Sequence, residues 1–170
     1  GDTVWYAGAS PYVIEGAVIV KDKALLTIEP GTTVQSKGPA LVVQGRLEAV
    51  GDETHLIHFE GSDGAPWQGI TFENVRENKN NLRYCSVKEA LYGVVCQSSS
   101  PSIESCEFTQ NGTAIKTSGA FSKPVIKDNT IRANTADGIA VVDGSQPTIM
   151  GNKIHGNGKA GIAAAMSAPL

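Results

Sequence analysis

The sequence is poor in aromatic residues, cysteine and net charge, and each shortage excludes a class of function. Aromatic residues make up 6% of the 170 residues, and the net charge is −3 with both signs scattered along the chain. No basic stripe is present that could follow a nucleic-acid backbone. No apolar run approaches the length of a membrane-spanning helix. We therefore predict no nucleic-acid partner and no insertion into a membrane.

Cysteine is scarce, and the three residues present, Cys85, Cys96 and Cys106, cannot be fully paired within one chain. Cys85 and Cys106 are separated by nearly one repeat of the pattern described below. This spacing favours buried free thiols on neighbouring repeats, although adjacent strands also come within disulfide distance. There is no Cys-x-x-Cys pair, and His55 and His58 fall on opposite faces of a strand-like segment. We predict no metal site.

The C-terminal half of the sequence contains an internal repeat with a period of about 23 residues, a length typical of a solenoid coil. Pro101, Pro124 and Pro147 recur at a constant spacing, and each is followed two positions later by isoleucine. The other columns that keep this spacing are Cys106, Asn129 and Asn152; Phe108, Ile131 and Ile154; and Asn111, Asn134 and Asn157.

The repeat predicts how each side chain is directed. Because side chains alternate along a strand, the isoleucine and phenylalanine columns face inward on two successive strands. Asparagine tolerates the left-handed backbone of a tight corner, so we expect Asn129 and Asn152 to form such corners. Stacked one coil apart, their amides would hydrogen-bond along the axis, with Cys106 in the same structural ladder.

These patterns predict an all-β fold, because no segment has a sustained helical period with caps. We expect a single-stranded right-handed parallel β-helix of about seven coils, each of roughly 20–23 residues and three short strands. The whole chain, 1–170, would form one domain. Residues 1–24 would be a cap or an incomplete first coil, and the coils would occupy 25–170. Polar turn formers at 61–66 and 76–81 predict two excursions from the coils.

Three N-terminal segments carry a family resemblance. They are LTIEPGTTV at 26–34, GRLEAVG at 45–51 and WQGITF at 67–72. They resemble the first coils of secreted bacterial and archaeal right-handed β-helix proteins, and the later coils resemble the pectate-lyase-like repeat. This resemblance implies an extracellular or cell-surface location. It says little about function, since that superfamily includes polysaccharide lyases, glycoside hydrolases, esterases, epimerases and adhesins.

The resemblance implies that the family's enzymes carry their catalytic residues on the outer face of one sheet. In this sequence, few catalytic candidates fall on that face. The nearest acids, Asp137 and Asp143, each stand alone, whereas most glycoside hydrolysis needs two carboxylates about 5–10 Å apart. None of the four arginines lies beside an evident acidic cluster. We therefore lean towards a non-enzymatic protein without cofactors. Calcium would be needed only if the protein were a lyase.

The weak candidates for ligand binding are Trp67, which could stack on a sugar or cover a coil edge, and the outward-facing Lys116 and Gln97. The remaining outward positions of the same strands are small and apolar. They could form an interface with a loop, a tail or another subunit. They are Val95, Ala140, Val142, Ala163 and Ala165.

The sequence therefore favours a non-catalytic extracellular or cell-surface module with a structural, adhesive or carbohydrate-binding role. A polysaccharide or another surface glycan would be its partner. The alternatives are a polysaccharide lyase or glycoside hydrolase, and a self-assembling solenoid subunit. Because Pro169 and Leu170 stand where the next coil would begin its second strand, we also expect further coils, another domain or a second copy at this end.

Overall fold

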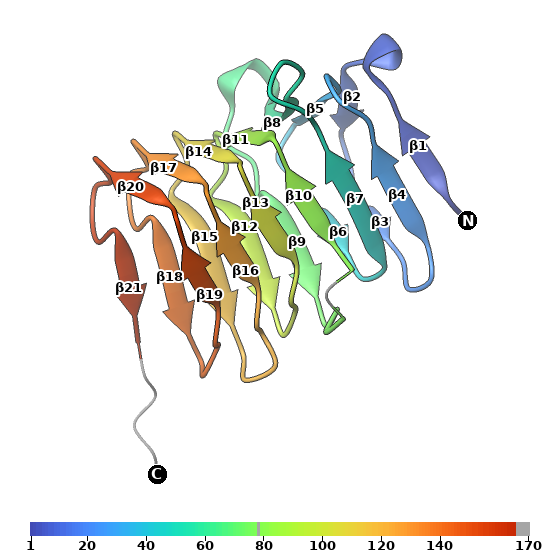
Figure 1. Cartoon of the computed structure of the whole chain (residues 1–170). Coiled ribbons are helices and arrows are strands. Elements are labelled where there is room, and N and C mark those ends of the chain that lie inside the picture. Colours follow the sequence, from blue (N-terminus) through green and yellow to red (C-terminus); the bar gives the residue numbers. More distant parts are fainter. Residues whose placement is uncertain (78, 166–170) are drawn as a thin grey trace.

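The computed structural model describes residues 1–77 and 79–165, which form a three-sided parallel β-solenoid (Figure 1). Within these residues each coil adds one strand to each of three seven-stranded parallel sheets. Helical structure there is confined to two short 3-10 turns, Ala7–Ala9 and Ser62–Gly64. The predicted parallel β-helix of about seven coils is confirmed.

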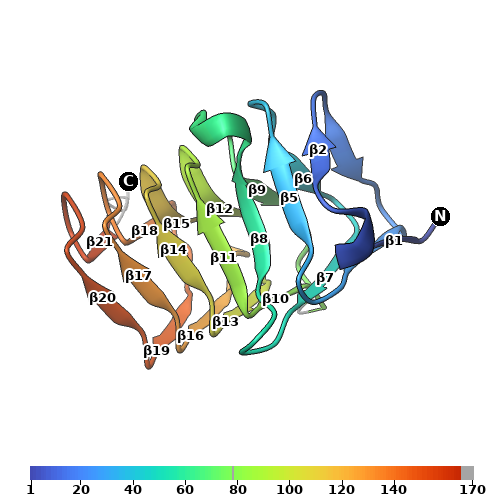
Figure 2. The same cartoon turned by 90° about the horizontal axis from the view of Figure 1, so that it is seen from above.

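The sheets are named A, B and C in the order in which each coil visits them. In Figure 1 sheet A lies in front of sheet C, and in Figure 2 sheet B faces the viewer. Sheet A contains β1 (Thr3–Trp5), β4 (Leu25–Ile28), β7 (Arg46–Val50), β10 (Asn81–Arg83), β13 (Ser102–Glu104), β16 (Val125–Lys127) and β19 (Thr148–Met150). Sheet B contains β2 (Tyr12–Ile14), β5 (Thr33–Ser36), β8 (Ile57–Gly61), β11 (Cys85–Lys88), β14 (Glu107–Thr109), β17 (Thr130–Arg132) and β20 (Lys153–His155). Sheet C contains β3 (Val18–Val20), β6 (Leu41–Val43), β9 (Ile70–Glu73), β12 (Tyr92–Gln97), β15 (Thr113–Ser118), β18 (Ile139–Val142) and β21 (Ile162–Ala164).

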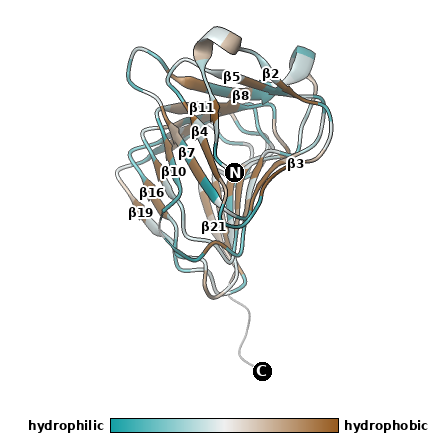
Figure 3. Ribbon diagram, turned by 90° about the vertical axis from the view of Figure 1, so that its right-hand side faces the viewer, coloured by the Kyte–Doolittle hydropathy of each residue, from teal (hydrophilic) through white to brown (hydrophobic). Residues whose placement is uncertain are grey.

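The core lies between the three sheets. Seen along the axis, apolar residues concentrate in the strands and polar residues in the turns (Figure 3). The predicted inward columns pair in register: Ile126 lies between Ile103 and Ile149, and Ile131 lies between Phe108 and Ile154. Burial of these apolar columns supplies the main stabilisation of the fold.

The predicted asparagine ladder is present at the corner between sheets A and B. The Nδ2 of Asn129 donates to the carbonyl of Ile103 at 2.9 Å and to Oδ1 of Asn152 at 3.0 Å. Its Oδ1 accepts from the backbone N–H of Cys106 at 2.9 Å. One coil earlier, the thiol of Cys106 replaces the asparagine amide as the donor, and it donates to the carbonyl of Leu82 at 3.4 Å. The corner thus satisfies backbone groups that would otherwise be buried without partners.

The asparagines themselves do not adopt the left-handed backbone that we expected. The residue before each ladder position does: φ is 51° at Ser105, 55° at Asp128 and 68° at Gly151. This arrangement turns the chain one residue earlier and directs the following side chain inward. The corner between sheets B and C repeats it, with a second ladder in which Asn134 donates to Asn157 at 2.9 Å.

The first 24 residues are not a cap or an incomplete coil, and that prediction is wrong. They contribute β1, β2 and β3, one strand to each sheet. Thr3 pairs with Leu26, Tyr12 with Val34 and Val18 with Leu41. The segment forms a full coil because its alternating apolar residues continue the inward columns of the next one.

The third coil is longer than the predicted repeat. Along sheet A, Ala49 pairs with Leu82, which in turn pairs with Ile103. The chain from Ala49 to Leu82 is more than half as long again as the chain from Leu82 to Ile103. The extra length lies in the two predicted excursions, one containing the 3-10 turn Ser62–Gly64 and one between β9 and β10. Pro169 and Leu170, on which the expected continuation was based, lie outside the described residues.

The three cysteines are free and buried. Cys85 and Cys106 occupy the same corner in neighbouring coils, since Ser86 pairs with Glu107 in the next position. Burial raises the pKa of the Cys96 thiol and that of Cys85. These thiols therefore behave as packed apolar groups with weak donors, as the spacing predicted.

Candidate functional site

The outer face of sheet C carries the predicted small and neutral column. Val95, Lys116, Ala140 and Ala163 are successive partners in β12, β15, β18 and β21. Lys116 is the only charged side chain among them, and its Nζ lies 5.2 Å from the centroid of the Tyr92 ring. An interface at Val95, Ala140, Val142, Ala163 and Ala165 stays a prediction, and so does ligand binding by Lys116.

The two acidic candidates, Asp137 and Asp143, are not brought together. They flank β18 at opposite ends, and a strand of four residues spans roughly 13 Å. The carboxylate of Asp137 accepts from the N–H of Ala160 at 3.0 Å, and that of Asp143 accepts from the Ser118 hydroxyl at 2.8 Å. Each therefore joins neighbouring coils and does not form a carboxylate pair.

Trp67 is buried, with 1% of its surface exposed, and its indole N–H donates to the carbonyl of Lys88 at 2.9 Å. No face of the ring is open to a sugar, so the sugar-stacking prediction for Trp67 is wrong. The alternative, cover of a coil edge, agrees with its isolated bridge to Ala90. A large aromatic side chain is buried here because its N–H finds a carbonyl partner.

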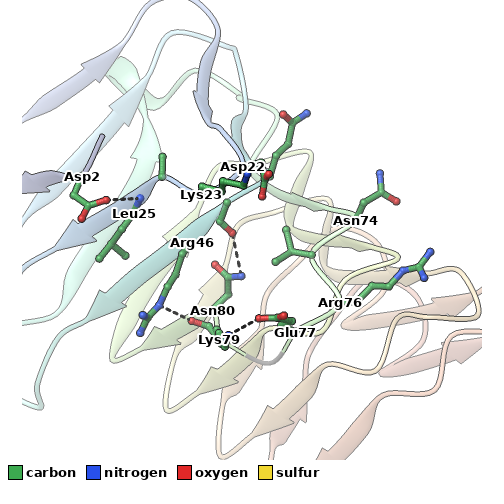
Figure 4. A pocket seen from close by; sticks show the side chains of 14 residues that line it. Asp2, Asp22, Lys23, Leu25, Arg46, Asn74, Arg76, Glu77, Lys79 and Asn80 are labelled. Carbon is green, nitrogen blue, oxygen red and sulfur yellow. Dashed lines mark hydrogen bonds and ion pairs between the residues drawn. The ribbon is translucent and has the colours of Figure 1, made fainter.

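A cleft of about 720 Å³ lies at the corner between sheets C and A (Figure 4). Its floor is formed by the turns that lead into β4 and β7. Its far wall is the excursion between β9 and β10. The lining residues are Asp2, 22–25, 44–46, 74–77, Lys79 and Asn80.

The excursion is fixed at both of its ends. The N–H groups of Asn74 and Val75 donate to the Gln97 carbonyl and the Ser99 hydroxyl, each at 2.9 Å. Asn80 is 1% exposed, and its Oδ1 accepts from the N–H of Leu47 at 2.6 Å. The wall of the cleft is therefore held by the coil after it and the coil before it. The predicted ligand residue Gln97 supports this wall through its backbone.

The cleft combines engaged and free polar groups. The Lys79 ammonium lies 2.6 Å from the Glu77 carboxylate, which lowers the pKa of that carboxyl. The Arg76 guanidinium lies 3.9 Å from the centroid of the Phe121 ring. By contrast, the exposed side chains of Asp22 and Asn74 make no hydrogen bond or ion pair with the described residues. They offer a carboxylate and an amide to a ligand.

A second, smaller groove of about 250 Å³ lies on the outer face of sheet A. Glu48 of β7 faces Asn81 of β10, which in turn faces Ser102 of β13. The Asn81 amide donates to the Glu48 carboxylate at 3.1 Å, and Ser102 donates to Glu104 at 2.9 Å. Arg83 lies beside Glu104 in register. The sequence showed no arginine beside an acidic cluster, and it is strand pairing that places Arg83 next to this single carboxylate.

Sequence reasoning missed this groove for a definite reason. One coil before Ser102 and Glu104, the equivalent positions are Asn81 and Arg83, at a spacing that resembles the regular repeat. The spacing from Asn81 back to Glu48 is much longer because of the excursions. The alternation rule identifies the outward side chains of each strand, but the length of an excursion is needed to align them.

The described residues give no sign of a metal centre or a membrane-spanning helix. Within 1–77 and 79–165, no three His, Cys, Asp or Glu side chains are close enough to hold an ion. No helix in this part of the chain is long and apolar enough to cross a bilayer.

The comparison with known proteins gives the class of this chain. The family model described as "right handed beta helix region" matches residues 68–168, more than half of the chain. Together with the three parallel sheets, this match shows that the chain belongs to the right-handed β-helix family. No curated protein and no solved structure matches it.

Proposed function

We propose that the protein is a non-catalytic extracellular or cell-surface β-helix module that binds carbohydrate in the cleft between sheets C and A. The observation that carries this proposal is the cleft itself, about 720 Å³ in volume with a wall fixed at both ends. A preorganised concave site lowers the entropic cost of binding a flexible ligand.

The chemistry of the cleft supports a carbohydrate ligand. A sugar hydroxyl both donates and accepts a hydrogen bond. The carboxylate of Asp22 can accept from one hydroxyl, and the amide of Asn74 can both donate and accept. The lining contains both basic and acidic side chains, so no single charge sign dominates; they are Lys23, Arg46, Arg76 and Lys79, and Asp2, Asp22 and Glu77. This balance favours a neutral glycan over a polyanion.

The placement of the two acids that the sequence singled out, Asp137 and Asp143, supports a binding role over catalysis at these positions. Asp137 and Asp143 are separated by β18, and both carboxylates already accept hydrogen bonds that join coils. A retaining or inverting glycosidase needs two carboxyl groups within about 10 Å, one on each side of the scissile bond. The extracellular or surface location and the adhesive role remain part of the proposal.

A glycan array followed by calorimetry tests the proposal. We expect a neutral glycan to bind, and Asp22→Asn and Asn74→Ala each to weaken its binding about tenfold, the loss of one good hydrogen bond to a ligand. Lys127→Ala, on sheet A outside both cavities, is the matched control and should bind as the parent protein does. Uniform absence of binding would contradict the proposal.

The enzyme alternative can be decided in the same experiment. The protein would be incubated with neutral and acidic polysaccharides, with and without calcium, and the products separated by chromatography. We expect no product. Product that disappears in Asp137→Ala or Asp143→Ala would contradict the non-catalytic part of the proposal.

A further inference from the structure

We propose that the groove on sheet A is a second sugar subsite, continuous with the cleft, so that one oligosaccharide chain occupies both. This inference rests on the proposed carbohydrate function and deepens it, because it defines the ligand as an extended chain and assigns residues that contact its far end. The groove residues concerned are Glu48, Asn81, Arg83 and Glu104.

The two cavities are joined by Arg46. This residue lines the cleft, and its Nε donates to the Lys79 carbonyl at 3.1 Å. Its Nη2 donates to the carboxylate of Glu48, which lines the groove, at 3.2 Å. Arg46 and Glu48 are two positions apart on the same face of β7, a separation of roughly 7 Å. On the next coil, the adjacent residues Asn80 and Asn81 line the cleft and the groove, respectively.

The groove is ordered by its own hydrogen bonds. The Glu48 carboxylate is held by Arg46 and by the Asn81 amide. One oxygen of Glu104 accepts from the Ser102 hydroxyl. These side chains project from three adjacent strands, which sit about 4.8 Å apart. Their positions are thereby set by sheet pairing, so little ordering is needed when a ligand binds.

The unused groups in the groove define the chemistry of its ligand. Arg83 and Glu104 are register partners, yet they form no ion pair within 4.0 Å among the described residues. The guanidinium of Arg83 instead lies 5.3 Å from the Tyr84 ring centroid. A group that bridges the two must accept from the guanidinium and donate to the carboxylate. Two neighbouring hydroxyls of a sugar ring do both.

The relative size of the two cavities suggests how a chain would divide between them. The groove has a volume of about 250 Å³, so we assign it fewer sugar units than the cleft. The cleft is nearly three times larger and would hold the preceding units. Short saccharides should therefore occupy the cleft alone, and longer ones should reach Arg83.

Arginine side-chain NMR separates the two sites, because the four arginines report on different places. Arg76 lines the cleft, Arg46 lies at the junction, and Arg83 lies in the groove. Arg132 pairs with Glu107 on sheet B and serves as the internal control. The protein would be titrated with manno-, cello- and xylo-oligosaccharides of one to six units, following the Nε–H resonances.

We expect disaccharides of the binding series to shift Arg76 and Arg46, and hexasaccharides to shift Arg83 as well, with Arg132 unchanged. Glu104→Gln should weaken the hexasaccharide about tenfold and leave the disaccharide unaffected, because it removes one charge-assisted hydrogen bond. Glu107→Gln is the matched control and should change neither. Circular dichroism of both variants checks that the coils are intact.

Each other outcome is decisive. If hexasaccharides shift Arg76 and Arg46 but never Arg83, the cleft binds sugar, and the subsite on sheet A is refuted while the proposed function stands. If Arg83 shifts but Glu104→Gln binds the hexasaccharide as tightly as the parent does, the bridging role assigned to Glu104 is wrong. If no arginine shifts with any of the three series, both proposals fail for these glycans.

Discussion

Replacement of Asn129 tests how much of the stability depends on the polar ladder. Asn129 is 1% exposed and sits between Cys106 and Asn152. In Asn129→Ala, the carbonyl of Ile103 loses its side-chain donor, and the N–H of Cys106 loses its acceptor. The Oδ1 of Asn152 keeps the backbone N–H of residue 129 as a partner.

The buried N–H of Cys106 is therefore orphaned, at about 1–3 kcal/mol, and the Ile103 carbonyl loses one net hydrogen bond of about 1 kcal/mol, so we expect the free energy of unfolding to fall by about 3 kcal/mol. Asn129→Cys should lose about half as much, because the thiol of Cys106 already donates to a carbonyl at the equivalent place. Lys127→Ala, at a half-exposed position on sheet A, should change the stability by less than about 0.5 kcal/mol.

Urea unfolding, followed by circular dichroism, measures the free energy of unfolding of all three variants. The dependence of this free energy on urea concentration should be equal in all of them, which confirms that the unfolded state is unchanged. The reasoning fails if Asn129→Ala costs no more than Lys127→Ala. It also fails if Asn129→Cys costs as much as Asn129→Ala, because the thiol would then not replace the amide donor at this corner.

Two further predictions concern the backbone at Gly45 and the buried thiol of Cys96. A Cβ at Gly45 would clash with the carbonyl oxygen of Lys21, so Gly45→Ala should lower the free energy of unfolding by about 1–3 kcal/mol, whereas Gly16→Ala, with open space around it, should not. Because burial keeps Cys96 protonated in the folded state, its contribution to stability should fall above about pH 8.5, where the unfolded thiol ionises, by up to about 1.4 kcal/mol per pH unit. Unfolding midpoints measured from about pH 7 to pH 10 should show a shallower decline in Cys96→Ala, and equal declines would contradict the assignment.

The fold was predictable because three independent signals coincide in the C-terminal coils. The prolines fix the period, the isoleucines fix the inward face, and Asn129 and Asn152 fix the corner. Each follows from local physics: alternation along a strand, burial of apolar surface and satisfaction of backbone groups. The left-handed backbone lies one residue earlier than the asparagine pattern indicated, because Asp128 tolerates it as asparagine does.

The candidate site was less predictable, since it depends on side chains brought together from different coils. Sequence alternation identified Lys116 and Gln97 as outward, but it could not show that Trp67 is covered on both faces. It also treats one acid at a time, so it does not place Glu48 and Glu104 in the same groove. Their common place in the groove depends on strand pairing across a coil whose length the repeat does not give.

The third coil, whose extra length obscures this pairing in the sequence, also forms the wall of the cleft. A strictly periodic solenoid repeats the same outer surface along its length, with no concavity deeper than the gap between neighbouring side chains. The excursion between β9 and β10 breaks the period, and its anchored residues wall off the corner above β4 and β7. Disagreement with a local rule tends to mark functional positions. In this chain the departure from the regular repeat is therefore the physical reason that the ligand site is assigned to the third coil and not to the more regular coils after it.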